Sequence, residues 1–282
     1  MKMKAKYNPD IFWEGRFKKY GHTGWSDQII YKYDQPLRLR VIKNILNKIQ
    51  GSIENKKILD VGCGVGDFSI MFAKMSAEVT GIDISEKAVG EAKKKAKGLC
   101  CDFKVTSIKN MDFQKSFDII LSITVLQHIP NKDLLSSIQK LADSLNIEGY
   151  IYILETAPVK LNQNTTNSEY QHFHTRKDWI KLFEKASMKL QFEIVYPGFG
   201  LSLIRLGDNI ARAIYNRFIS KKNQEIPTTT TNQLILINNN KLVKIYSLFE
   251  KIIFIFSKPI DYYMPFLAKF GTTRVMVFKK VK

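Results

Sequence analysis

An apolar segment that runs directly into three glycines is the feature that most constrains how this chain can fold. Residues 58–61 read as a buried strand, and Gly62, Gly64 and Gly66 follow at alternate positions before a helix-like segment that begins at Phe68. Glycine lacks a Cβ atom, so such a loop can adopt positive φ and lets a ligand approach the main chain. The sequence therefore predicts a strand, a ligand-binding loop and a helix in immediate succession.

The spacing of the glycines separates this loop from a dinucleotide-binding loop. A dinucleotide fold requires G-x-G-x-x-G with a helix N-terminus aimed at a pyrophosphate, whereas residues 62–66 read G-x-G-x-G after Asp60, which favours a ligand without phosphates. Here the sequence resembles the class I S-adenosylmethionine-dependent methyltransferases, whose first motif is a strand that ends in an acidic residue and a glycine loop. The resemblance implies cofactor contacts from Asp60, Gly62, Cys63, Gly64 and Gly66.

Short apolar runs alternate with amphipathic segments from Lys57 to Glu155, which is the pattern of a doubly wound α/β sheet. The predicted strands span residues 57–60, 78–83, 101–106, 117–123, 150–155, 190–196 and 271–279. Helices are predicted from Phe68, from Glu86 with Ser85 as N-cap, over 131–145 before a turn at 146–149, and over 176–186. The resemblance implies a Rossmann-like seven-stranded sheet whose last strand is antiparallel.

Two segments lie outside this core, so the chain divides into four predicted parts. These are an N-terminal lead or cap over residues 1–50, a methyltransferase core over 51–196, a helical insertion over 197–270 and a final core strand over 271–282. In the lead, after an aromatic and glycine-bearing stretch, a helix is predicted from about Pro36 to Ile49, with Pro36 near its first turn. In the insertion, helix-like pieces at 203–218 and 241–256 flank a polar breaker at 227–231, and the whole is expected to be a substrate cap or an interface.

Composition narrows the setting and the partners. The chain is 45% hydrophobic and 25% charged, as an ordinary globular protein is, and its net charge of +18 favours nucleic acid, acidic glycans, nucleotide sugars or a phospholipid surface. A simpler explanation of the positive charge is that many of the lysines are scattered along helices and lie on solvent-exposed faces. Three cysteines without paired spacing indicate a reducing cytosol, and no metal is expected. We expect no secretory signal and no spanning helix, hence a cytoplasmic protein, with peripheral membrane contact through residues 200–268 left open.

The acidic residue that would hold the cofactor ribose ends the second predicted strand. In the family that the sequence resembles, a carboxylate at the position of Asp83 accepts hydrogen bonds from both ribose hydroxyls, and Ile84 would pack on the adenine. A carboxylate suits this task because it is purely an acceptor. The alternative is that Asp83 only caps the helix that follows.

The adenine contact departs from the family pattern. The family usually has an Asp after the third strand that meets the adenine amino group, whereas this sequence has Ser107 there, followed by Ile108. A serine oxygen is able to accept the same hydrogen bond. Asp102 and Asp112 are the alternatives, and the resemblance does not choose among the three.

The fourth motif bears on the substrate class. Residues 117–130 resemble the family segment in which a strand end, here Ile123, reaches the methionine half of the cofactor. The sequence lacks the Asn/Asp-Pro-Pro-Tyr/Phe element typical of enzymes that methylate DNA bases or glutamine. Residues 126–129, Leu-Gln-His-Ile, instead resemble small-molecule O-methyltransferases, and the lead and insertion loosely resemble glycan-modifying enzymes. We therefore expect O-methylation of a small-molecule or glycan-type acceptor.

A base would assist a hydroxyl acceptor. Methyl transfer from a sulfonium needs mainly alignment, and a positioned base contributes roughly 10²- to 10⁴-fold. Candidates at the carboxyl edge of the sheet are His172, His174 and Glu155, together with His128 in the fourth motif and His22 in the lead. For each histidine, a structural role is the alternative.

The lead also offers residues for covering the cofactor. Tyr20 or Trp25 would act as a lid, and Arg38 or Arg40 would face the cofactor carboxylate. The alternative is that the aromatic side chains only attach the lead to the core. Two other functions stay open: an RNA methyltransferase, which the net charge would suit, and a methyltransferase-like protein that binds a membrane or a partner through the insertion without catalysis.

Overall fold

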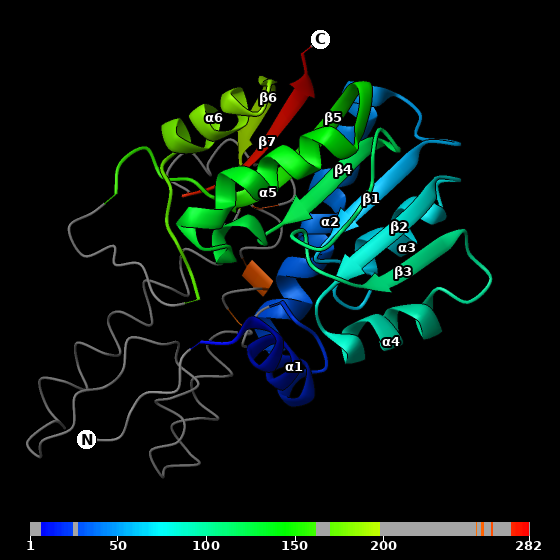
Figure 1. The fold of residues 1–282 in the computed structure, drawn as a ribbon. Helices are drawn as coiled ribbons and strands as arrows, with labels where there is room; N and C mark the ends of the chain where they lie inside the picture. The colour runs from blue at the N-terminus through cyan, green and yellow to red at the C-terminus, as the bar shows by residue number, and fades with distance from the viewer. Residues whose placement is uncertain are drawn as a thin grey trace, which may run out of the picture. The chain divides into compact units, whose positions relative to one another are not determined.

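Seven strands form one mixed sheet in the order β3-β2-β1-β4-β5-β7-β6 (Figure 1). The strands are β1 (Lys57–Val61), β2 (Glu78–Asp83), β3 (Cys101–Val105), β4 (Phe117–Ile123), β5 (Leu145–Thr156), β6 (Met188–Val195) and β7 (Thr273–Lys280). Strands β1 to β5 run parallel, and β7 pairs antiparallel with both β5 and β6. The expected Rossmann-like sheet with an antiparallel last strand is confirmed. This computed structural model describes residues 7–24, 28–161, 170–197, 252, 255, 256, 261 and 272–281.

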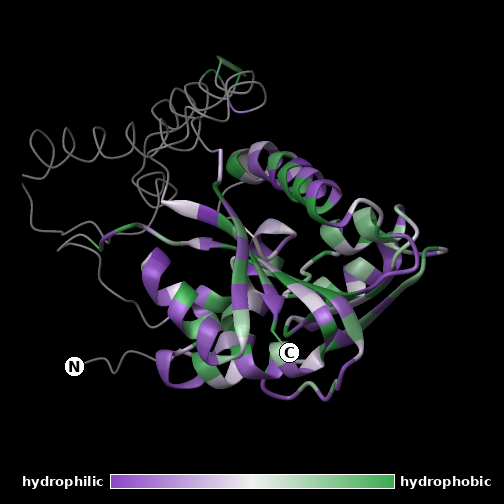
Figure 2. Cartoon of the chain, turned by 90° about the horizontal axis from the view of Figure 1, so that it is seen from above, coloured by the Kyte–Doolittle hydropathy of each residue, from purple (hydrophilic) through white to green (hydrophobic). Residues whose placement is uncertain are grey.

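Helices cover both faces of the sheet, as Figure 2 shows from above. They are α1 (Pro9–Tyr20), α2 (Gln28–Gln50), α3 (Asp67–Ala73), α4 (Glu86–Lys95), the short η1 (Leu126–His128), α5 (Asn131–Ser144) and α6 (Arg176–Lys185). On one face, Ile138 of α5 and Trp179 and Phe183 of α6 pack in one apolar cluster with the strands. On the other, Val89 and Ala92 of α4 pack on Phe103. Apolar burial on both faces explains the near-continuous hydrophobic runs of β1 and β4.

Ser85 begins α4 as the sequence predicts. Its Oγ accepts a hydrogen bond from the backbone N–H of Ala88 at 3.2 Å. The cap satisfies one of the first N–H groups of the helix, which have no intrahelical acceptor.

The lead differs from its prediction. Helix α1 is not anticipated by the sequence analysis, although Asn8 caps it, Pro9 occupies its first turn and Gly21 ends it at φ 73°. Proline inside the start and glycine just past the end are a recognised helix signature. The start predicted for the lead helix, near Pro36, is wrong: that helix is α2, which begins at Gln28, so Pro36 lies inside it. Proline removes one helical hydrogen bond, which costs about 3 kcal/mol, and burial of Ile42 and Leu46 on the same helix offsets that cost.

The turn predicted at residues 146–149 is wrong as well, because β5 already begins at Leu145. Leu145 pairs with Phe117, and the register then shifts before Tyr150 pairs with Ile119, so the extra residues form an irregularity within the strand. Glu148, at φ 65°, lies in this irregularity. The polar, glycine-bearing sequence marks a bulge rather than a chain reversal.

Helix α1 and the segment between β3 and β4 differ from the other elements that surround the strands. Helix α1 contributes no buried residue, in contrast to α4, α5 and α6. Residues 106–116, between β3 and β4, form turns and no helix.

Among the described residues, no helix is both long and apolar enough to cross a membrane.

The chain separates into two units. The first holds the described residues of 7–24, 39–161, 170–196 and 272–281, and therefore the sheet; the second includes 28–38, 197, 252, 255, 256 and 261. Within the second unit, Arg38 Nε pairs with Asp34 Oδ2 at 2.5 Å, and the hydroxyl of Tyr33 donates to Asp261 Oδ2 at 2.5 Å. The insertion pieces at 203–218 and 227–231, most of 241–256, and Trp25 lie outside the described residues. The four-part division of the chain stays a prediction.

Candidate active site

The glycine loop after β1 has the backbone that the sequence predicts. Gly62, Gly64 and Gly66 have φ values of 67°, 52° and 81°. The N–H groups of Gly62 and Cys63 both donate to the carbonyl of Ile82, at 2.8 and 3.0 Å. The loop is thus fastened to the end of β2.

At two positions the loop requires glycine for space as well as for φ. A Cβ on Gly62 would lie 2.3 Å from Cγ2 of Val125, and one on Gly64 would lie 2.7 Å from Oγ1 of Thr23. Real Cβ atoms do not approach other atoms that closely. The turn after β4 and the lead after α1 therefore both lie against the glycine loop, at the carboxyl ends of the strands, where open α/β sheets bind ligands.

Asp83 lies at the centre of this arrangement. Its Oδ2 accepts the N–H of Gly64 at 2.9 Å, and its Oδ1 accepts the N–H of Ser85 at 2.8 Å. The side chain is 8% exposed, and burial raises the pKa of its carboxyl group. Each carboxylate oxygen can accept a second hydrogen bond, so Asp83 keeps acceptor capacity at the edge of the sheet. It does not cap α4, because that role belongs to Ser85.

Asp60 and Cys63 direct their side chains into the protein. The hydroxyl of Ser69 on α3 donates to Asp60 Oδ2 at 2.6 Å, and burial raises the pKa of Asp60 to about 7. The thiol of Cys63 packs with Val89 and Phe103, and burial raises its pKa. Asp60 therefore joins β1 to α3, and any contact of Cys63 with a ligand would come from its backbone. Their cofactor roles stay predictions.

The remaining predicted cofactor residues surround Asp83 and the end of β4. Thr106 donates its N–H to the Asp83 carbonyl, which brings half-buried Ser107 next to the end of β2. Ser107 Oγ accepts the N–H of Asn110 at 3.3 Å, and Ile108 is buried in the core. Three other predicted residues are half-buried: Ile84 directly follows Asp83, Ile123 is the last residue of β4, and Tyr20 is the last residue of α1.

His128 lies in η1, directly after β4. Its Nδ1 is 2.5 Å from the carbonyl oxygen of Tyr170, so Nδ1 carries the proton and donates it. Its ring meets Trp13 edge to face, with centroids 4.9 Å apart. Burial lowers the pKa of His128 to about 4. The ring is neutral near pH 7, and its Nε2 is a weak proton acceptor.

The segment that contains His172 and His174 runs along η1. His172 donates its backbone N–H to the carbonyl of Gln127 at 2.7 Å. Within the described part of the chain, its Nε2 is buried without a hydrogen-bond partner. His174 packs on Trp179, with centroids 4.9 Å apart, and burial lowers its pKa. Its Nδ1 is likewise buried and unbonded among the described residues, but the ring is part of the packing of α6.

Glu155 fastens the turn that carries His128. It is fully buried near the end of β5, and its Oε1 accepts the N–H groups of Val125 and Leu126 at 3.0 and 2.9 Å. These bonds fix the turn after β4, in which Thr124 has φ 55°. The geometry supports a positioning role for Glu155, because a base at this site would have to give up those bonds; its catalytic role stays a prediction.

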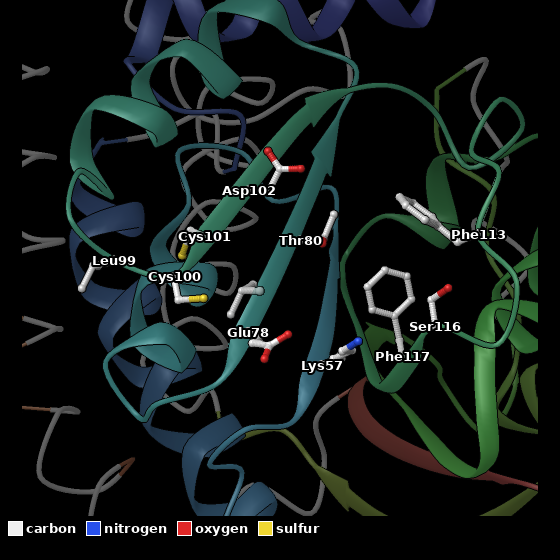
Figure 3. A pocket seen from close by; sticks show the side chains of 11 residues that line it. Lys57, Glu78, Thr80, Leu99, Cys100, Cys101, Asp102, Phe113, Ser116 and Phe117 are labelled. Atoms are coloured by element: carbon white, nitrogen blue, oxygen red, sulfur yellow. The ribbon is translucent and has the colours of Figure 1, made fainter.

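A separate hollow of about 560 Å³ lies at the other end of the strands. Figure 3 shows the side chains that line it, among them the first residues of four strands, Lys57, Glu78, Cys101 and Phe117. Two further lining residues, Phe113 and Ser116, belong to the segment between β3 and β4. Lys57 and Glu78 begin β1 and β2, whereas the glycine loop follows the end of β1 and Asp83 ends β2. The hollow therefore lies at the opposite edge of the sheet and is no part of the candidate active site.

Comparison with known proteins agrees with the geometry. Residues 58–149 match the methyltransferase domain family. A ubiquinone biosynthesis O-methyltransferase of Actinobacillus pleuropneumoniae is 34% identical over 148 residues, which is 49% of this chain and 61% of that protein. Its counterpart in Pelagibacter ubique is 36% identical over 129 residues, covering 42% and 54%. The chain thus matches about 60% or less of the length of these relatives.

Solved structures support the same fold. The magnesium protoporphyrin IX methyltransferase of Synechocystis, with bound S-adenosylmethionine, has a TM-score of 0.53 at 22% identity, over 68% of this chain and 92% of that one. The [4+2]-cyclase SpnF has a TM-score of 0.55 at 14% identity, over 85% and 80%. At these identities the likeness concerns the fold alone. Together with the match of residues 58–149 to a methyltransferase domain, it confirms the expected resemblance to the class I S-adenosylmethionine-dependent methyltransferases.

Proposed function

We propose that this protein is an S-adenosylmethionine-dependent O-methyltransferase that acts on a hydroxyl group of a small-molecule acceptor. The observation that carries the proposal is the position of Asp83, whose carboxylate is fixed between the glycine loop and Ser85 at the carboxyl edge of the sheet. The relatives named ubiquinone biosynthesis O-methyltransferase favour oxygen as the methylated atom and a small molecule as the acceptor.

The residues present fit the cofactor. Asp83 is a buried carboxylate with remaining acceptor capacity, as a ribose diol requires. Gly62 and Gly64 allow close approach to the backbone, and half-buried Ile84 follows Asp83 as an apolar surface for the adenine. When bound, the cofactor supplies an activated methyl group on a sulfonium. The chain itself has to align the acceptor and exclude water.

His172 is the residue best placed to remove a proton from the acceptor. Its Nε2 is buried and is without a partner in the described part of the chain. Its backbone is held to η1 through Gln127. His128 suits proton removal less well because its pKa is lowered to about 4, and its bond to Tyr170 instead fixes the segment that presents His172. A base so placed contributes roughly 10²- to 10⁴-fold.

The finer alternatives stay predictions. No described residue indicates a glycan-type acceptor. The relatives named ubiquinone biosynthesis O-methyltransferase favour a small molecule other than a glycan. RNA as acceptor, and membrane binding without catalysis, rest on the net charge of +18 and on the basic insertion, most of which lies outside the described residues.

Calorimetry with S-adenosylhomocysteine tests the cofactor site. We expect Asp83→Asn to bind at least about tenfold more weakly, because a carboxylate that accepts ligand hydrogen bonds is replaced by an amide. Asp143→Asn is the matched control, since Asp143 is an exposed carboxylate of α5. Equal affinity in the wild type and in Asp83→Asn would remove Asp83 from the site. Transfer of labelled methyl groups to a panel of phenols, alcohols and saccharides tests the acceptor class, and methylation of saccharides alone would contradict the proposal.

A further inference from the structure

Helix α1 is held at the carboxyl edge of the sheet through Glu14. The hydroxyl of Ser85 donates to Glu14 Oε2 at 2.8 Å, and Lys87 Nζ pairs with Glu14 Oε1 at 3.1 Å. Ser85 in turn donates its N–H to Asp83. One face of α1 is therefore directed at the turn that holds the ribose-binding carboxylate.

The opposite face of α1 is directed at the histidines. Residues in an α-helix are separated by about 100°, so Phe12 and Arg16 each stand about 160° around the helix from Glu14. The ring of Phe12 stacks on Tyr170 with centroids 5.3 Å apart, and neighbouring Trp13 contacts His128. This face therefore covers η1 and the segment of His172, the side on which an acceptor would be deprotonated.

Arg16 is a half-buried cation on this face. One N–H of its guanidinium donates to the carbonyl of Gly24 at 2.8 Å, and its Cζ lies 5.1 and 5.2 Å from the ring centroids of Phe12 and Trp13. No carboxylate among the described residues forms an ion pair with it. A guanidinium has five N–H donors, so most of its capacity is available beside the aromatic rings.

We infer that Arg16 binds an anionic group of the acceptor, most simply a carboxylate, and so selects acidic acceptors. This inference rests on the proposed methyltransferase function. A planar guanidinium matches a carboxylate through two parallel hydrogen bonds, and removing a cation partly from water is costly without an anion nearby. The adjoining faces of Phe12 and Trp13 suit the apolar part of an aromatic acid.

Binding of benzoate and uncharged benzamide to the full chain, saturated with S-adenosylhomocysteine, tests this inference by calorimetry. We expect the wild type to bind benzoate about tenfold or more tightly than benzamide, and Arg16→Met to lose that preference. Lys19→Met is the control, because it removes the same charge from an exposed position of α1. A wild type without a preference, a wild type that binds neither probe, or an Arg16→Met protein that keeps the preference would each overturn the inference.

A second arm distinguishes the two carboxylates that could reach Arg16. S-adenosylhomocysteine carries an amino-acid carboxylate, and methylthioadenosine lacks it. We expect Arg16→Met to bind both with wild-type affinity. Weaker binding of S-adenosylhomocysteine alone would assign Arg16 to the cofactor and overturn its role toward the acceptor. These are binding measurements, so a lack of methyl transfer to any acceptor would count against the proposed function and leave the benzoate result to decide on Arg16.

Discussion

Gly64 donates its backbone N–H to the carboxylate of Asp83 at 2.9 Å, which joins the glycine loop to the strand that follows it. Nineteen residues separate the two in the sequence. The bond makes the conformation of the loop depend on the same carboxylate that we assign to the cofactor ribose. Loop and ribose site are therefore parts of one structure.

Space around Gly62 yields the first prediction. Gly62→Ala places a Cβ 2.3 Å from Val125 at φ 67°, and overpacking together with left-handed strain should lower the free energy of unfolding by about 2–4 kcal/mol. Gly90→Ala, in the middle of α4 with nothing within 4 Å of the new atom, should raise it by about 0.5–1 kcal/mol. Urea denaturation of both variants measures the difference, and equal stabilities would contradict the close contact between Gly62 and Val125.

Buried Asp60 gives a pH dependence of stability. Its pKa in the folded protein is about 7, above the ordinary 3.8, so the folded state holds this proton more tightly than the unfolded state does. The contribution of Asp60 to the free energy of unfolding is therefore fully present below about pH 4 and is lost as the pH rises through 7. Three pKa units correspond to at most about 4 kcal/mol. Asp60→Asn mimics the protonated form and should lack this loss.

Comparing the two proteins by urea denaturation from pH 5 to 8 isolates this contribution from that of other titrating groups. We expect the stability of Asp60→Asn to rise relative to that of the wild type across this range. A constant difference between the two curves would show that Asp60 does not change protonation in this window.

Loss of the Glu14 anchor should release α1 without unfolding the core, because α1 has no buried residue. We expect Glu14→Ala to increase amide hydrogen exchange in residues 9–20 by about tenfold and to leave exchange in β1 and β4 unchanged. Glu91→Ala, in the middle of α4, is the control, because it removes a carboxylate that pairs with Lys94 of the same helix. Unchanged exchange in α1 would show that its aromatic contacts with Tyr170 and His128 suffice to hold it.

His172 should affect turnover more than binding. We expect His172→Asn to lower kcat by roughly 10²- to 10⁴-fold with little change in the affinity for S-adenosylhomocysteine, measured once an acceptor is identified. His174→Asn should instead lower stability, because His174 packs on Trp179. A reversed pattern would exchange the roles of the two histidines.

Local signals explain what the sequence predicts well. The glycine loop, Asp83 and the cap at Ser85 belong to short segments in which one strand, turn and helix follow directly, and the structure places them as expected. The strand pattern also predicts the sheet, because burial on both faces requires continuous apolar runs.

Contacts between distant segments explain what it misses. The bond from Ser85 to Glu14 spans 71 residues, and nothing near Glu14 announces its partner. Glu155 is a candidate base because it lies near the end of a strand at the active edge; its sequence does not reveal that its Oε1 also accepts an N–H of the turn thirty residues earlier. Helix α1, by contrast, is missed although it has local signals: Asn8 and Pro9 at its start and Gly21 at its end.

The surface position of α1 affects how such a protein can diversify. Substitutions on a helix with no buried residue leave the core intact, so they are tolerated more readily than changes in β4 or α5. Residues such as Phe12, Trp13 and Arg16 can therefore vary while the methyl-donor half of the molecule stays the same. Acceptor preference would then drift among descendants of one ancestral chain through exchanges in its first helix, at little risk to folding.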